Sequence, residues 1–219
     1  MDELRKLHNG AKKELITKWV RRGSSCLDCG CGRGGDWWKW KAVGVRVTAI
    51  DPDANSLIEA KKRAEDIGLD VEFLGKGDIR QAARSGPFDV VCYNFAIHYI
   101  VDSWTESLAA LERSVRPGGL LIGITPEKDR AEAMVGPDSR FQDALGNEFE
   151  IRNGRLMVRL ADGPFYADGP KEEPLLDASS FHEALVSRGF QRVAWEPMLK
   201  RPNGLVSDLY SKFVYRKNR

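Results

Sequence analysis

The amino-acid sequence predicts an α/β fold, in which helices cover a mostly parallel, doubly wound sheet of about seven strands. Short apolar segments alternate with helical ones over residues 25–125, and a glycine-rich loop directly follows the first apolar segment. Near the end of the chain, Pro202-Asn203-Gly204 joins two strand-like segments, so the last pair is expected to be antiparallel. A chain of 219 residues fits a single domain, 1–219.

The elements follow in order from the N-terminus. Leu4, Leu7, Ala11, Leu15 and Trp19 recur at helical spacing, so residues 1–22 are expected to form an amphipathic helix. Strands are expected at 25–29, 45–50, 71–74, 89–93 and 120–125, and helices at 36–41, 55–67 and 103–115. The last of these helices stops at the Arg-Pro-Gly-Gly run of 116–119, a strong helix terminator.

Residues 126–176 interrupt this rhythm and are expected to form an insertion after the fifth strand. Apolar residues alternate with polar ones on both sides of Asn153-Gly154, which is a strong signal for a type I′ β-hairpin. Helical spacing resumes near 180–188, where Ser180 and Glu183 could form a capping box. Strands at 191–196 and 205–215 then close the sheet.

The lengths of the apolar runs and the distribution of charge narrow the class of protein to which the chain can belong. No apolar run approaches the ~20 residues that span a bilayer, and the N-terminus lacks the apolar core of a signal peptide. We therefore expect an intracellular protein, in the nucleus or the cytoplasm. The net charge is only +2, yet residues 1–41 hold ten Lys or Arg against five Asp or Glu. Residues 200–219 hold six against one, so both ends could converge on an anionic ligand.

Four cysteines, Cys26, Cys29, Cys31 and Cys92, raise the question of a metal site. Cys26 and Cys29 have Cys-x-x-Cys spacing, but no second ligand pair follows. On a strand, a separation of three residues places the two side chains on opposite faces. Buried reduced thiols are therefore expected, and no metal.

The glycine run Gly-Cys-Gly-Arg-Gly-Gly at 30–35 predicts a nucleotide site on a Rossmann-like fold. Gly30 and Gly32 let the backbone turn sharply and approach a ligand closely, and the next helix begins at the loop. Asp51 ends the second strand, 19 residues after Gly32, where its carboxylate can accept hydrogen bonds from ribose hydroxyls. NAD and S-adenosylmethionine share this requirement, so the loop alone does not separate them.

Three further features favour S-adenosylmethionine. Asp28 lies inside the first strand, where its charge suits the amino group of a methionine moiety. Asp78 follows the third strand and can accept from the adenine amino group. After the fourth strand, the run Tyr-Asn-Phe-Ala-Ile-His-Tyr at 93–99 places polar and aromatic groups over the expected position of the methyl group.

With these motifs in place, the chain resembles the mRNA cap guanine-N7 methyltransferases of eukaryotes and viruses. The run Leu-Asp-Cys-Gly-Cys-Gly-Arg-Gly-Gly-Asp at 27–36 resembles the family's Leu-Asp-Leu-Gly-Cys-Gly-Lys-Gly-Gly-Asp, and Asn-Phe-Ala-Ile-His-Tyr at 94–99 resembles its Gln-Phe-Ala-Leu-His-Tyr. The Gly-Ile-Thr-Pro run at 123–126 and the Asn9 and Lys12 pair also have counterparts. The resemblance extends from about residue 8 to residue 215.

The resemblance implies two sets of contacts. Cofactor contacts are expected from Lys12, Gly30, Asp51, Asp78, Asn94 and Tyr99. Cap contacts are expected from Asn9, Arg33, Lys39, Arg63, His98, Glu173 and Tyr210. Three of these residues are cations that suit the triphosphate bridge, and Glu173 can accept from the Watson–Crick N–H groups of guanine.

The chain also departs from the family pattern. Asn94 replaces Gln, Arg33 replaces Lys, and His8 stands where the family has Asn. The chain is compact, so the resemblance suits a viral enzyme or a domain of a larger capping protein, with other capping domains or a stimulatory subunit as partners.

The resemblance implies methyl transfer to N7 of the guanine cap at the 5′ end of mRNA. Because N7 carries a lone pair and no proton, we expect proximity and orientation to suffice, with His98 and Tyr99 as positioning residues and no catalytic base. Three alternatives remain open: another methyltransferase acting on tRNA or a small molecule, a catalytically silent cap-binding subunit, and an NAD oxidoreductase. The insertion with Glu173 argues against a generic methyltransferase, and the intact glycine loop argues against a silent subunit.

Overall fold

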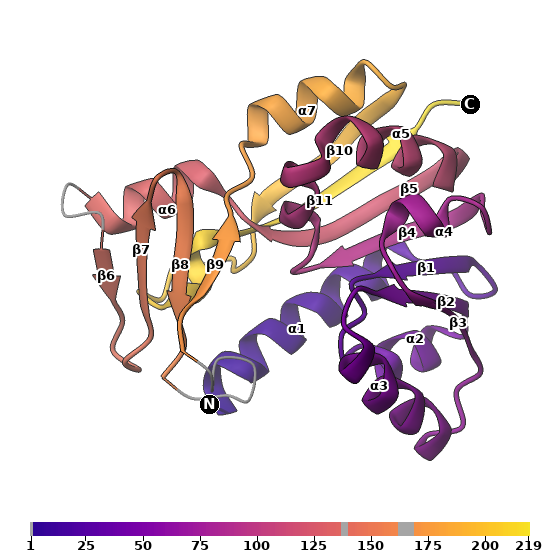
Figure 1. Ribbon diagram of the computed structural model, residues 1–219, viewed down its shortest axis with the longest axis horizontal. Helices are drawn as coiled ribbons and strands as arrows, with labels where there is room; N and C mark the ends of the chain where they lie inside the picture. The colour runs from indigo at the N-terminus through magenta and orange to yellow at the C-terminus, as the bar shows by residue number, and fades with distance from the viewer. Residues whose placement is uncertain (1, 137–139, 162–168) are drawn as a thin grey trace.

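The computed structural model describes residues 2–136, 140–161 and 169–219 (Figure 1). Parts of the predicted insertion, residues 137–139 and 162–168, lie outside the described residues, as does Met1. Two sheets are present, one of seven strands and one of four. Among the described residues, no helix is long and apolar enough to cross a membrane.

The seven-stranded sheet has the order β10-β11-β5-β4-β1-β2-β3. Its strands are β1 (Ser25–Cys29), β2 (Arg46–Asp51), β3 (Val71–Lys76), β4 (Phe88–Asn94), β5 (Val115–Pro126), β10 (Phe190–Pro197) and β11 (Tyr210–Lys217). β1 to β5 pair in parallel, whereas β11 pairs antiparallel with both β5 and β10. The doubly wound sheet and its antiparallel end are therefore as the sequence predicts. The chain order reverses between β1 and β4, where parallel sheets bind ligands.

Helices cover both faces of this sheet (Figure 1). On one face lie α1 (Asp2–Trp19), α2 (Trp37–Val43) and α3 (Ala54–Asp66), and on the other α4 (Ile79–Ala82), α5 (Trp104–Ser114) and α7 (Ala178–Val186). Cys26 packs with the first set and Cys29 with the second, because residues three apart on a strand face opposite ways. All four cysteines are buried and free, and burial raises the pKa of each thiol.

The insertion after β5 forms a second sheet. Helix α6 (Lys128–Val135) leads into four antiparallel strands: β6 (Arg140–Gln142), β7 (Glu148–Arg152), β8 (Arg155–Arg159) and β9 (Lys171–Pro174). Asn153 and Gly154 have φ values of 51° and 73°, as the predicted type I′ turn requires. The hairpin β7–β8 is confirmed, but the sequence did not indicate α6, β6 or β9. Strands of three and four residues are too short for an alternating pattern to stand out.

Several predicted boundaries were wrong. Asp177, not Ser180, caps α7, because its side chain accepts a hydrogen bond from the Ser180 N–H at 2.7 Å. The predicted strand 205–215 starts only at Tyr210, after the 3-10 helix η4 (Val206–Leu209). β5 begins at Val115, earlier than the strand predicted at 120–125. The Arg-Pro-Gly-Gly run that ends α5 is therefore itself part of the strand.

Candidate active site

A cavity of about 640 Å³ lies at the carboxyl ends of β1, β2 and β4, where the strand order reverses. The loops after these strands form its floor. α1, β9 of the second sheet and the start of β11 also contribute residues to its lining. The cavity therefore draws on the nucleotide-binding half of the sheet and on the insertion together.

The glycine loop brings main chain close to the cavity. Gly30 has a φ of 72° and donates its N–H to the Ile50 carbonyl at 2.9 Å. A Cβ at this position would lie 2.5 Å from the Cβ of Ala96, so only glycine fits there. Gly32, with a φ of 53°, donates its N–H to Asp51 Oδ2 at 2.7 Å.

Asp51 is buried at the end of β2 and lines the cavity. Its other oxygen, Oδ1, accepts the Asp53 N–H at 2.9 Å. Burial raises its pKa, although the two N–H donors act in the opposite direction. Each carboxylate oxygen has a further lone pair, so Asp51 can still accept from a ligand hydroxyl.

Asp36 is the centre of a charge cluster that the sequence did not predict. Its Oδ1 lies 2.7 Å from Lys12 Nζ and 2.8 Å from Lys39 Nζ, and Oδ2 accepts from Asn94 Nδ2 at 2.9 Å. Burial opposes its ionisation, but the two ammonium groups hold its pKa below the usual value. The one sequence feature that could have indicated this role is the position of Asp36 at the end of the Gly-Gly-Asp run.

Asn94 provides a test of whether the cavity suits S-adenosylmethionine. Its Oδ1 is buried with no hydrogen-bond partner in the part of the chain that the structure describes, and Asn94 lines the cavity. A buried acceptor without a donor is costly, so a ligand donor is expected there. Together with the cradle at Gly30 and the carboxylate of Asp51, this open acceptor fits a ligand with hydroxyl and amino donors.

Two other predicted cofactor residues occupy different places. Asp28 is buried but is not among the residues that line the cavity, and it accepts from Trp40 Nε1 at 2.9 Å. Burial, then the charge of Asp36, raises the pKa of Asp28 to about 7. Asp78 does line the cavity, where it caps α4 and pairs with Arg80. Direct contact of Asp28 with a cofactor stays a prediction.

In the lining of the cavity, His98 of the main fold meets Glu173 of the second sheet. Buried His98 lies on the 3-10 helix η1 (Ile97–Ser103), and buried Glu173 lies on β9, with 3.5 Å between Nε2 and Oε2. Neither ring nitrogen of His98 makes a hydrogen bond to any described residue. Tyr99 lies against the His98 ring, with centroids 4.2 Å apart, and burial followed by the charge of Glu173 raises its phenol pKa.

Three aromatic rings that line the cavity pack against one another. Phe95 stacks on His8 at 4.9 Å between ring centroids and meets the edge of Tyr210 at 5.0 Å. Phe95 has a φ of 63°, a left-handed conformation that is uncommon for a large side chain and often marks functional sites. The His8 ring lies 3.1 Å from Ser207 Oγ, and burial lowers its pKa to about 4. The sequence predicted a cap contact for Tyr210 but no role for His8 or Phe95.

The predicted phosphate-binding cations do not all meet. Arg33 and Arg63 both pair with Glu59, the former at 3.4 Å, so these two converge. Lys39 is instead held by Asp36, by Asn9 Oδ1 at 3.0 Å and by the Gly35 carbonyl at 3.0 Å. The structure therefore brings together Arg33 and Arg63, and separately Lys39 and Asn9, and none of these four lines the cavity.

Comparison with known proteins decides the class of enzyme. Residues 26–119 match a family model described as a methyltransferase domain. A malonyl-[acyl-carrier protein] O-methyltransferase from Enterobacter lignolyticus is 36% identical over 79% of this chain and 72% of its own length. The chain belongs to the class I S-adenosylmethionine-dependent methyltransferases.

Other relatives of this methyltransferase differ in substrate. An mRNA cap guanine-N(7) methyltransferase from Oryza sativa is 29% identical over 82% of this chain, which spans 51% of that protein. Among solved structures, an S-adenosylmethionine-dependent methyltransferase from Clostridium acetobutylicum matches with a TM-score of 0.69 and 15% identity, over 98% of this chain and 92% of that one. The structural match shows the fold, and S-adenosylmethionine is the cofactor.

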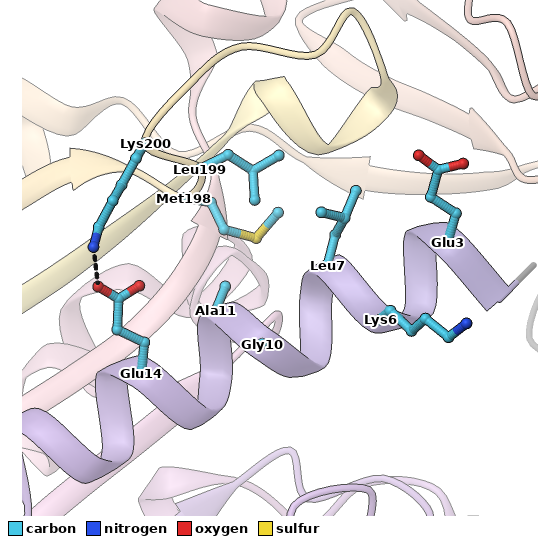
Figure 2. Close-up of a pocket in the computed structure, with 9 residues that line it drawn as sticks. All are labelled: Glu3, Lys6, Leu7, Gly10, Ala11, Glu14, Met198, Leu199 and Lys200. Atoms are coloured by element: carbon cyan, nitrogen blue, oxygen red, sulfur yellow. Dashed lines mark ion pairs between the residues drawn. The ribbon is translucent and has the colours of Figure 1, made fainter.

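The methyltransferase has a second hollow of about 650 Å³ between α1 and residues 198–200 (Figure 2). Leu7, Ala11 and Met198 form its apolar part, and Glu14 pairs with Lys200 across one end at 3.2 Å. It contains none of the predicted site residues. The cavity at the ends of β1, β2 and β4, which holds most of the predicted cofactor residues, is therefore the candidate site of methyl transfer.

Proposed function

We propose that this methyltransferase transfers a methyl group to N7 of the guanine cap of mRNA. The observation that supports this most is Glu173, a buried carboxylate that faces His98 in the cavity. Guanine presents neighbouring N–H donors on its Watson–Crick edge, which a carboxylate can accept, whereas adenine offers an acceptor in their place. The aromatic rings of Tyr99 and Tyr210 line the same cavity and offer surfaces for a purine.

Methyl transfer requires the protein mainly to hold the donor and the acceptor in position. Bound S-adenosylmethionine supplies a methyl group on a sulfonium centre. Guanine N7 has a free lone pair and no proton, so His98 has no proton to remove and acts as a positioning residue. Holding two reactants in a productive geometry can contribute roughly 7–11 kcal/mol to catalysis. Asp51 and the glycine loop orient the donor, and Glu173 orients the acceptor.

The proposed partner is the capped 5′ end of mRNA. Arg33 and Arg63 share Glu59, and they could exchange part of that pairing for the triphosphate bridge. Lys39 could reach the bridge only by leaving Asp36 or Asn9. The same proposal places the enzyme wherever caps are made, in the nucleus, the cytoplasm or a viral factory, with other capping domains or a stimulatory subunit as further partners.

A second candidate comes from the malonyl-[acyl-carrier protein] relative, which is named for methyl transfer to an acidic acceptor. An anionic carboxylate entering this cavity would approach the carboxylate of Glu173, and like charges at short range in a buried site repel strongly. Glu173 therefore favours an acceptor with N–H donors over an acidic one.

The deciding experiment measures transfer of labelled methyl from S-adenosylmethionine to capped RNA, to the same RNA without a cap, and to malonyl-carrier protein. We expect label on capped RNA, released as 7-methylguanosine after digestion, and background levels on the other two. Label on malonyl-carrier protein alone would replace the proposed function with the second candidate. Label on internal positions of uncapped RNA would point to an RNA methyltransferase of another specificity.

A further inference from the structure

Three tryptophans lie on α2, and they differ in environment. Trp37 and Trp40 are 1% and 0% exposed and belong to the core, where Trp37 Nε1 donates to the Ala60 carbonyl and Trp40 Nε1 donates to Asp28. Trp38 is 66% exposed. Burial accounts for the first two tryptophans, whereas most of the Trp38 ring is open to solvent.

One cation, Lys41, lies over the ring of Trp38. Lys41, one turn later on α2, lies with Nζ 5.7 Å from the centroid of the Trp38 ring and donates to the Ile67 carbonyl after α3. Glu59 and Arg63 are four residues apart on one side of α3, and Ile67 lies four residues further along, directly after the helix. Glu59 at the start of this row pairs with Arg33.

We define a strip from these residues: ion pairs link Arg33, Glu59 and Arg63 at one end, and at the other end Lys41 lies over Trp38 and donates to the Ile67 carbonyl. From Glu59 to Ile67 it extends for roughly 12 Å, at the rise of an α-helix. Glu59 pairs with two of its three cations, Arg33 and Arg63, and the charge of Asp53 also interacts with Arg33. The strip starts at the cavity, since Gly32, next to Arg33, and Ser56, one turn before Glu59, both line it.

We propose that this strip binds the RNA that follows the cap, with the base of an early nucleotide stacked on Trp38. The inference rests on the proposed function and deepens it, because it assigns a path for the RNA outside the cavity. Basic groups that follow a backbone, combined with an exposed aromatic face, are the features that bind single-stranded nucleic acid without sequence preference. Arg33 and Arg63 hold the triphosphate bridge at the start of this path, and Lys41 contacts a phosphate beyond it and also holds the indole ring in place.

The test compares a cap dinucleotide with a capped oligoribonucleotide as methyl acceptors. For Trp38→Ala, we expect the KM for the capped oligonucleotide to rise about tenfold, within the range for loss of one base stack. The KM for the dinucleotide and both kcat values stay as in the wild type. Trp38→Phe keeps an aromatic face and retains most of the affinity. Val186→Ala removes an exposed apolar side chain from α7, on the other face of the sheet, and should change neither substrate.

A binding measurement separates this inference from the proposed function. Fluorescence anisotropy of a labelled, uncapped oligoribonucleotide reports on the strip alone, and here too Trp38→Ala should bind about tenfold more weakly. If the wild type methylates no cap but this difference persists, only the proposed function fails. If Trp38→Ala binds and methylates the oligonucleotide like the wild type, the strip is not an RNA site. Equal losses for dinucleotide and oligonucleotide would place the effect of Trp38 in the cavity and also refute the inference.

Discussion

The surroundings of Glu173 in the fold could not be predicted from its position in the sequence. It lies on a four-residue strand of the second sheet, yet its side chain is 5% exposed and lies 3.5 Å from His98 of the main fold. Its neighbour Glu172 points to solvent and pairs with Arg155 at 2.5 Å. Two adjacent glutamates on one strand thus face opposite ways, and only one of them enters the cavity.

Glu173→Gln should weaken binding of the acceptor and leave the donor unaffected. The glutamine keeps the size of the side chain but lacks the charge, and a lost hydrogen bond to a charged group costs roughly 1.5–3 kcal/mol. The KM for a cap analogue should therefore rise about 10- to 100-fold. Glu172→Gln on the same strand is the matched control, and the affinity for S-adenosylhomocysteine should be unchanged in both. An unaltered KM in Glu173→Gln would remove this residue from the guanine pocket.

His8 gives the protein a predictable response to acid. Burial, followed by the charge of Lys12, lowers its pKa to about 4 in the folded protein, against 6.5 when unfolded. The unfolded chain therefore binds more protons between these two values, and the folded state loses stability as the pH falls from 6.5 to 4. The loss attributable to His8 is about 2–3 kcal/mol.

His8→Asn should reduce this pH dependence. Denaturant unfolding at several pH values gives the free energy of unfolding of the wild type and of the variant. In the difference between the two, the contributions of the carboxylates that both proteins share cancel. We expect the wild type to lose more stability than the variant across this window. Parallel stability curves would mean that the His8 ring titrates normally in the folded protein.

At the scale of elements, the glycine loop combines two constraints in one residue. Gly30 needs a left-handed backbone, and its missing Cβ leaves room for Ala96 after β4. Gly30→Ala should therefore destabilise the protein by about 2–4 kcal/mol, the sum of backbone strain and overpacking. Thermal unfolding measures the loss, and the double variant Gly30→Ala/Ala96→Gly should recover the part due to overpacking.

Gly10→Ala is the matched control for this prediction. Gly10 lies inside α1, and a Cβ there would meet nothing within 4 Å. Alanine in the interior of a helix stabilises it by roughly 0.5–1 kcal/mol over glycine, so the melting temperature should rise slightly. Equal effects of the two substitutions on the melting temperature would show that the loop at Gly30 can move away from Ala96 and accept a Cβ.

The elements that the sequence predicted well are those with a local cause. Hydrophobic periodicity located β1 to β4 and α1 to within a few residues, and the Asn153-Gly154 turn fixed the hairpin. What the sequence did not predict depends on distant contacts. Asp36 gains its role from Lys12 on α1 and Asn94 on β4, and the ring cluster at Phe95 needs residues from both ends of the chain. No local sequence pattern indicates contacts between residues that lie far apart in the chain.

For the whole molecule, the two ends of the chain meet at the active site. α1 contributes His8 and Lys12 to the cavity, and β11 contributes Tyr210. An ion pair network joins them, because buried Lys212 of β11 lies 3.3 Å from Glu14 of α1. The lysines near the two ends thus serve in part to hold α1 against the sheet, rather than acting only on an anionic ligand.

The pH dependence of the complete reaction should separate donor binding from methyl transfer. Asp28, with a pKa of about 7, is largely neutral near pH 6 and ionises as the pH rises, which adds negative charge beside the Lys12 and Asp36 cluster. If the cationic amino group of the donor lies at that end, its binding should strengthen from about pH 6 to pH 8, about tenfold for each unit by which the ligand lowers the pKa of Asp28.

The turnover number with both substrates saturating should stay flat over the same range, because guanine N7 has no proton to lose. Asp28→Asn keeps an acceptor for Trp40 and should abolish the pH dependence of affinity for S-adenosylhomocysteine, as calorimetry can measure. Calorimetry in buffers of different ionisation enthalpy should detect a proton released on binding to the wild type only. A steep fall in kcat with one ionisation, still present in Asp28→Asn, would instead require a catalytic base and contradict transfer by orientation alone.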